Sequence, residues 1–98
     1  MQVHGPGRET VTAACKDISP MGVCFSAPLD CKKDDVLTID YFLRDEQESV
    51  RLTVRVMWSE FVDPATGYFC GGEVLDVEEA KRELFAGYYF QRLRRKIP

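Results

Sequence analysis

The chain has 98 residues, of which 45% are hydrophobic and 30% are charged, and its formal net charge at pH 7 is −3. These values predict one soluble globular domain spanning 1–98, and the negative charge argues against binding of a nucleic-acid polymer. No apolar run approaches the roughly 20 residues that cross a bilayer, and no basic and then apolar leader opens the chain. We therefore expect no membrane span and a cytoplasmic location.

The first part of the chain predicts short strands separated by turns. Residues 1–7 include a Gly-Pro-Gly sequence that breaks regular structure, so we expect a flexible N-terminal segment there. The β-branched residues within 9–15 favour a first strand, and the apolar residues within 22–26 favour a second. Residues 28–35 are polar and are predicted to form a loop.

The middle of the chain carries the clearest strand signal. Apolar and other residues alternate through 36–43 and again through 50–58, which is the period of two of a strand with one buried face. The residues expected to share the inner faces are Leu37, Ile39, Tyr41, Leu43, Val50, Leu52, Val54, Val56 and Trp58. A turn over 63–67 then leads to a strand over 68–75, in which the pair Gly71-Gly72 suggests a bulge or a sharp bend.

The chain is predicted to end in a helix over 76–95. Asp76 is a favourable N-cap, and Glu79 stands three residues later as in a capping box. Aromatic residues lie on several faces of this helix, so we expect them to fill the mouth of a barrel or, in part, to form a surface for a protein partner. These residues are Phe85, Tyr88, Tyr89 and Phe90. Short strands followed by one helix favour an antiparallel barrel over a parallel sheet.

The cysteines indicate structural thiols. Cys15, Cys24, Cys31 and Cys70 form no C-x-x-C pair, which zinc sites usually contain, so we expect no metal and no disulfide. Cys31 lies in the polar loop and is predicted to be the most exposed of the four.

No group of residues has the pattern of a catalytic site. His4 is the only histidine, Ser19 has no evident base, and no glycine-rich phosphate loop is present. We therefore expect a protein that is not an enzyme and that uses no cofactor.

One turn carries a distinctive motif. Asp17-Ile18-Ser19-Pro20-Met21-Gly22 reads D-x-S-x-x-G between two apolar runs. The aspartate offers acceptor oxygens and the serine both donates and accepts, while the glycine permits a positive φ or close approach of a ligand to the backbone. A plain hairpin turn also accounts for these residue types.

Three segments of the chain together resemble the PilZ domains, which are receptors for the bacterial second messenger cyclic di-GMP. The motif with its following strand, 17–25, resembles the signature turn of that family; 54–58 resembles its central strand, and 67–75 its last strand. The resemblance implies a six-stranded antiparallel β-barrel with a C-terminal helix and a role in nucleotide signalling. It also implies that Asp17 and Ser19 bond the ligand and that Gly22 allows close approach.

The chain departs from the family at its second signature, an R-x-x-x-R pair in a mobile segment before the first strand. Arg8 is the nearest candidate, and it supplies one guanidinium where the family uses two. Arg51 and Arg55 have the right spacing but lie inside a predicted strand, so we interpret them as a chance match. The basic residues Arg92, Arg94 and Arg95 at the end of the helix are a further source of positive charge.

Two functions remain open at this point. In the first, the domain binds cyclic di-GMP through Asp17, Ser19, Gly22 and Arg8 and transmits binding to a partner as the N-terminal segment orders over the ligand. In the second, it is a degenerate member that binds no nucleotide and acts as a protein-protein adaptor through its aromatic helix. Loss of two arginines predicts at least a hundredfold weaker binding, unless an arginine pair precedes Met1 in a longer natural chain.

Overall fold

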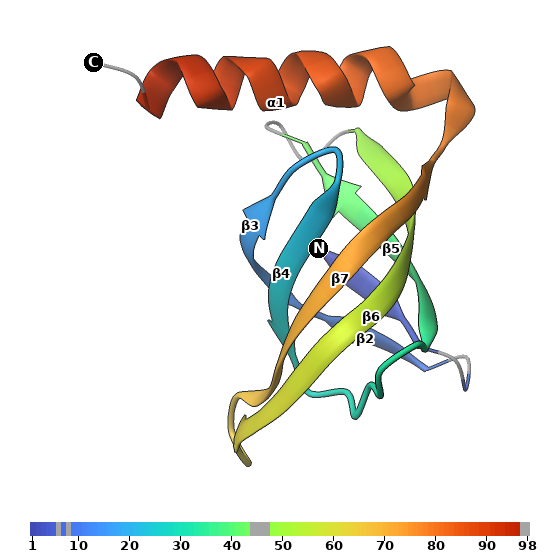
Figure 1. Ribbon diagram of the computed structural model, residues 1–98, viewed down its shortest axis with the longest axis vertical. Coiled ribbons are helices and arrows are strands. Elements are labelled where there is room, and N and C mark those ends of the chain that lie inside the picture. Colours follow the sequence, from blue (N-terminus) through green and yellow to red (C-terminus); the bar gives the residue numbers. More distant parts are fainter. Residues whose placement is uncertain (6, 8, 44–47, 97–98) are drawn as a thin grey trace.

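The computed structural model describes residues 1–5, 7, 9–43 and 48–96, with side chains as far as residue 89. It contains seven strands, one short 3₁₀ helix and one α-helix. In chain order these are β1 (Gln2–His4), β2 (Thr10–Thr12), β3 (Ala14–Ile18), β4 (Gly22–Ala27), β5 (Val36–Phe42), β6 (Ser49–Asp63), β7 (Gly67–Val77), η1 (Glu79–Lys81) and α1 (Arg82–Lys96). The strands form one antiparallel sheet in the order β2-β1-β5-β6-β7-β4-β3, which curls around the core (Figure 1).

The two edges of this sheet are consecutive in the chain. Only Ala13 separates β2 from β3, and its N–H donates to the Met1 carbonyl at 2.8 Å while the Met1 ammonium donates to the Ala13 carbonyl at 3.2 Å. The segment 10–18 therefore pairs with β1 along its first half and with β4 along its second half. The all-β, barrel-like fold is confirmed, and the sheet has seven strands where six were implied because this segment is divided at Ala13.

The prediction of a flexible segment over 1–7 is wrong for residues 2–4. These residues form β1, which lies between β2 and β5, and Val3 is completely buried. The Gly-Pro-Gly sequence follows this strand and lies in the connection to β2, where Gly5 N–H donates to the Glu9 carbonyl at 2.8 Å. A three-residue strand is too short to show a period that could outweigh the neighbouring breaker residues.

The core is built mainly from the alternating residues of β5 and β6. The inner residues of β5 and β6 are buried as predicted as far as Val56, together with Val23, Phe25 and Cys70 from the neighbouring strands. Trp58 departs from this pattern and is 41% exposed. Cys31, expected to be the most exposed thiol, is buried because the segment 28–35 contributes two residues, Leu29 and Cys31, to the core.

The helix begins later than its sequence suggests. Residues 76 and 77 still belong to β7, where Asp76 pairs with Thr53 of β6, and α1 starts only at Arg82. The Asp76 carboxylate accepts from Arg82 at 2.9 Å instead of capping a helix. The predicted start at 76 and its capping box are therefore wrong, because pairing with β6 extends the strand through the capping sequence.

The helix α1 lies across the end of the curled sheet (Figure 1). Phe85 is buried, and the ring of Tyr41 at the end of β5 contacts both Phe85 and Tyr88, with centroid distances of 6.5 and 5.9 Å. The Tyr41 and Tyr88 hydroxyls lie 3.2 Å apart and share a hydrogen bond. Filling of the barrel mouth is thus confirmed for Phe85 and Tyr88, while the side chain of Phe90 lies outside the described residues. Among the described residues, no helix has the length and apolar character needed to cross a bilayer.

Candidate ligand groove

The D-x-S-x-x-G motif forms the turn between β3 and β4. Ser19 N–H donates to the Gly22 carbonyl at 2.9 Å and so closes the turn. The Ser19 hydroxyl accepts from the N–H groups of Met21 and Gly22 at 3.2 and 3.1 Å and lies 3.4 Å from the Gly22 carbonyl, to which it donates. Its hydrogen-bonding capacity is therefore used within the turn.

Gly22 contributes close packing to this turn. Among the described residues the only glycine with a positive φ is Gly67, so Gly22 has an ordinary backbone conformation. A Cβ atom at residue 22 would lie 3.2 Å from the carbonyl oxygen of Gly72 in β7. The Met21 carbonyl also accepts from Val74 N–H at 3.0 Å, and these contacts hold the turn against β7.

A β-bulge turns Asp17 toward solvent. Cys15 pairs with Phe25 and Asp17 with Cys24, so Lys16 is an extra residue in β3. The extra residue changes which side chains face inward, and Ile18 is buried while Asp17 is exposed. Asp17 Oδ1 accepts from Ile18 N–H at 2.9 Å. Within the described part of the chain, no hydrogen bond reaches Oδ2, which is left available for a ligand.

A second bulge turns Trp58 to the same outer face. Val56 pairs with Gly72 and Trp58 with Gly71, so Met57 is the extra residue in β6. The indole then lies over Gly71, where a Cβ atom would collide with it. Trp58 also contacts Phe69, with ring centroids 5.1 Å apart. Sequence reasoning placed Trp58 in the core, although the pair Gly71-Gly72 on the partner strand marked the bulge.

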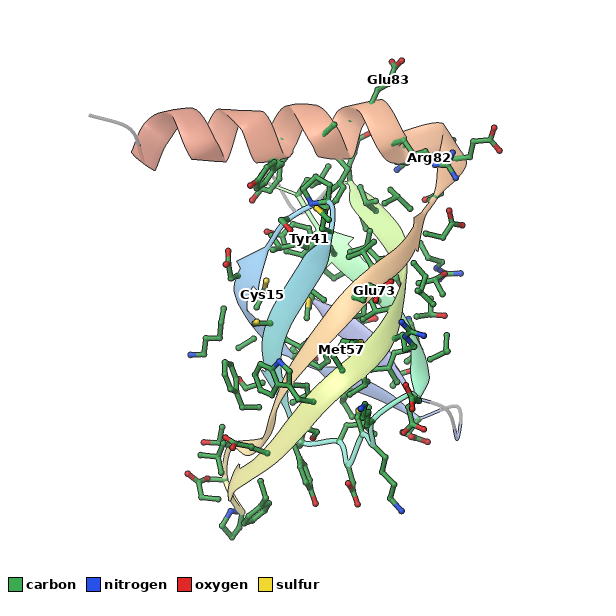
Figure 2. All side chains as sticks on the ribbon, viewed as in Figure 1. Cys15, Tyr41, Met57, Glu73, Arg82 and Glu83 are labelled. Atoms are coloured by element: carbon green, nitrogen blue, oxygen red, sulfur yellow. The ribbon has the colours of Figure 1, made fainter. Side chains whose placement is uncertain are left out.

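These features border one open groove of about 370 Å³, within the range of roughly 300–1,000 Å³ typical of ligand pockets. Its floor is the backbone of β7 at Gly71 and Gly72, and its walls come from β6 and from the β3–β4 turn. In Figure 2, Met57 of β6 and Glu73 of β7 lie on neighbouring strands. The lining residues are Asp17, Ser19, Met21, Gly22, Val23, Cys24, Met57, Trp58, Gly71, Gly72 and Glu73.

The groove is more acidic than basic. Asp17 and Glu73 are carboxylates, and Glu73 accepts from Arg55 Nη2 at 3.0 Å. The Nε of Arg55 is buried and has no hydrogen-bond partner among the described residues. Arg55 is therefore a cation bound to a residue that lines the groove, whereas Arg51 binds Asp40. Both arginines lie inside β6, as expected from the sequence.

The predicted contribution of Arg8 falls outside the described residues. Its neighbours belong to the connection between β1 and β2, whereas the motif forms the connection between β3 and β4. Asp17 lies seven positions after Thr10, which corresponds to at most roughly 23 Å of extended chain. The two connections lie at opposite ends of the segment 10–18 (Figure 1).

The residues that the structure describes include no group of three or more His, Cys, Asp or Glu side chains placed to hold a metal ion. In chemical terms, the groove offers a free carboxylate oxygen, an aromatic face and a closely approachable backbone. These groups suit a flat ring system that carries N–H donors.

Comparisons with known proteins agree with this architecture. A family profile described as PilZ domain matches residues 1–91, which is nearly the whole chain. Neither the curated proteins nor the solved structures yield a significant match. The matched residues include every strand, the bulged motif turn and most of the C-terminal helix. The chain therefore belongs to the PilZ domain family, a family of cyclic di-GMP-binding domains.

Proposed function

We propose that this domain is a cyclic di-GMP receptor that binds one guanine of the ligand in the groove and passes the binding event to a partner. The observation that carries the proposal is the arrangement of Asp17 and Trp58. Two separate bulges bring a half-exposed indole and a carboxylate oxygen that has no hydrogen-bond partner among the described residues to the same groove. A buried or self-satisfied carboxylate at residue 17 would have argued against a receptor.

In this proposal Asp17 Oδ2 accepts from the N–H groups on the guanine edge, as carboxylates accept from base donors. Trp58 stacks on the ring, which contributes about 1–3 kcal/mol per base in proteins that bind single strands. Gly22 keeps the turn close to β7, so the ligand approaches the backbone there. Ser19 acts by holding the turn, and its direct bond to the ligand, expected from the family, requires one of its turn hydrogen bonds to open.

The phosphates require cations that the groove itself does not supply. The ligand carries two negative charges, and the groove adds two carboxylates against one nearby guanidinium. Charge-assisted bonds contribute about 1.5–3 kcal/mol each, so affinity depends on arginines from outside the groove. Arg92, Arg94 and Arg95 are the source that the fold favours, because α1 lies across the end of the sheet at which the motif turn is found (Figure 1). Arg8, the candidate from the sequence, precedes β2 and is separated from Asp17 by the whole of β2 and most of β3.

A titration with cyclic di-GMP tests the receptor proposal directly. Trp58 is the only tryptophan in the chain, so its fluorescence reports occupancy of the groove. Asp17→Asn retains one oxygen for Ile18 N–H and replaces the free oxygen by a donor, so we expect at least a tenfold loss of affinity. Asp30→Asn, an exposed carboxylate outside the groove, should bind like the wild type.

Alkylation of Cys24 provides a second readout of the same site. Cys24 lines the groove, whereas Cys15 packs against the core beneath the sheet. Bound ligand should slow the alkylation of Cys24 and leave the rate at Cys15 unchanged. Equal affinity of Asp17→Asn and wild type, with no protection of Cys24, would show that the groove is not the binding site.

The acidic groove also supports a second candidate function, that of a degenerate PilZ domain which acts as an adaptor. An adaptor surface on α1 would differ from the one expected from the sequence, because Phe85 is buried and Tyr88 contacts Tyr41. Among the described apolar residues from 84 to 89, Leu84 is exposed and Tyr89 is half-buried. The absence of any fluorescence or calorimetric response at millimolar cyclic di-GMP would favour this function over the receptor.

A further inference from the structure

Two cysteines from distant parts of the chain meet beneath the groove. Cys31 belongs to the segment between β4 and β5, and Cys70 belongs to β7. Their side chains share a hydrogen bond, and both are buried, with exposed fractions of 2% and 0%. The Cys70 sulfur also lies 3.5 Å from the Ser59 hydroxyl. Both thiols are free in this structure.

The surroundings of Cys31 and Cys70 favour a single negative charge on the two thiols. Hydrogen bonds from the Cys31 thiol and, secondarily, from the Ser59 hydroxyl lower the pKa of Cys70 to about 7 in spite of its burial. The same hydrogen bond raises the pKa of Cys31, and burial raises it further. This arrangement favours a Cys70 thiolate beside a protonated Cys31. A thiolate is the reactive form of cysteine toward oxidants.

We propose that Cys31 and Cys70 form an oxidisable dithiol that closes to an intramolecular disulfide in the presence of a peroxide. The Cys70 sulfur attacks one peroxide oxygen, the O–O bond breaks, and the departing hydroxide takes up a proton to give water. The resulting sulfenic acid is attacked by the Cys31 sulfur, which forms the S–S bond and releases a second water. In sum, two thiols lose two hydrogen atoms and one peroxide is reduced to two waters.

The disulfide would tie the 28–35 segment to β7 next to the groove. Cys70 directly precedes Gly71, whose backbone lies under the Trp58 indole. The bond would close a loop of about 40 residues, and loops of this length restrict the unfolded chain strongly. The oxidised protein is therefore more stable than the reduced one. This inference holds whether or not the groove binds a nucleotide.

Burial makes the reaction selective for small oxidants. Cys15 and Cys24 are half-buried and accessible, so a bulky thiol reagent should modify these two first. Hydrogen peroxide is close to water in size and suits a site beneath a surface segment. Bulky reagents and peroxide should thus give opposite patterns on the same four cysteines.

The test treats the wild-type chain and the Cys15→Ser/Cys24→Ser variant with hydrogen peroxide, then denatures them, alkylates free thiols and maps the peptides by mass. We expect a Cys31–Cys70 cross-linked peptide in both, and a rise in Tm of at least about 5 °C that a dithiol reductant reverses. Cys31→Ala and Cys70→Ala, measured as two independent variants, should show neither change.

Three results would overturn the proposal. Recovery of Cys31 and Cys70 as alkylated free thiols would show that the pair does not react. Recovery of Cys70 as a sulfinic acid without a cross-link would show that Cys31 does not capture the oxidised sulfur. A cross-link between two chains, or one that involves Cys15 or Cys24 in the wild type, would assign the oxidation to other thiols.

Discussion

At the scale of single residues, Ser19 and Asp17 occupy one turn and serve different purposes. The Ser19 hydroxyl accepts two backbone N–H groups, whereas one oxygen of Asp17 has no partner among the described residues. The motif was correctly placed by sequence at a turn between two strands. The bulge at Lys16 decides which side chain of the motif faces the protein and which faces a ligand. No residue of the motif predicts this bulge.

Replacement of Ser19 by alanine separates the two roles. We expect Ser19→Ala to lower the free energy of unfolding by about 1 kcal/mol, because two backbone N–H groups lose their acceptor. Urea unfolding measures this loss. Ser26→Ala, on the outer face of β4, should change stability by less than about 0.5 kcal/mol. A weaker affinity for cyclic di-GMP with no loss of stability would instead indicate a direct bond from Ser19 to the ligand.

At Gly71, a substitution that adds a single methyl group would change the aromatic wall of the groove. A Cβ atom there collides with the Trp58 indole, so Gly71→Ala should displace the ring and shift its fluorescence spectrum. Gly87 offers a matched control, since a Cβ atom there meets nothing within 4 Å and the residue lies in α1. Gly87→Ala should leave the spectrum unchanged and stabilise the protein by up to about 1 kcal/mol. Unchanged fluorescence in Gly71→Ala would contradict the described position of the indole.

At the scale of secondary-structure elements, the sheet shows where a period of two is informative and where it fails. The alternation in β5 and β6 predicted the inner residues as far as Val56. Beyond that point the bulge at Met57 adds one residue, and the side chains that follow it, beginning with Trp58, change face. Trp58 was therefore assigned to the core. The candidate site could be located from the motif, but its aromatic wall required the register between strands.

The predicted start of the helix at residue 76 is wrong for a related reason. Asp76 and Glu79 have the local pattern of a capping box, yet Asp76 pairs with Thr53 and continues β7. Local capping contributes about 1 kcal/mol, and the hydrogen bonds and packing of an extended strand pair outweigh it. Such competition between local and tertiary interactions is invisible in a single sequence.

A cross-strand ion network joins β1, β5 and β6 and makes stability depend on pH. Asp40 of β5 accepts from Arg51 of β6 at 2.9 Å and from His4 of β1 at 2.8 Å. These bonds, with Arg51 first, lower the pKa of Asp40 below its ordinary value of 3.8. The ionised carboxylate therefore stabilises the folded chain above about pH 4, and this contribution is lost as the pH falls through the lower pKa of the folded state.

We expect Asp40→Asn to reduce stability at pH 7 by less than about 1 kcal/mol, because Arg51 is largely exposed and its pair is screened by solvent. The difference from wild type should persist down to about pH 3.8 and shrink in urea titrations as the pH falls further, through the lower pKa of the folded state. Arg51→Gln should cause a similar loss that does not add to that of Asp40→Asn. A difference that stays constant over this pH range would show that the charge of Asp40 plays no part.

At the scale of the whole molecule, closure of the sheet and docking of the helix depend on few contacts. The curled sheet joins its own edges through Ala13 and Met1, and α1 covers one end of it (Figure 1). Among the described residues, α1 is joined to the strands by Arg82, which donates to Val77 and Asp76 of β7, and by its aromatic residues, of which Phe85 is buried. Sequence predicted that aromatic residues fill the barrel mouth, but their positions relative to Tyr41 follow from where β5 ends.

Phe85 is therefore the residue on which attachment of the helix depends. Phe85→Ala removes a ring that is 2% exposed and contacts Tyr41, so we expect a loss of about 3 kcal/mol or more in the free energy of unfolding. Leu84→Ala, at a neighbouring position that is 42% exposed, should cost less than about 0.5 kcal/mol. Urea unfolding followed both by far-ultraviolet circular dichroism and by Trp58 fluorescence measures the helix and the sheet separately. Equal stability of the two variants would show that α1 is not anchored on the sheet by this ring, whereas an early loss of helical signal in Phe85→Ala alone would show that the helix detaches while the groove stays folded.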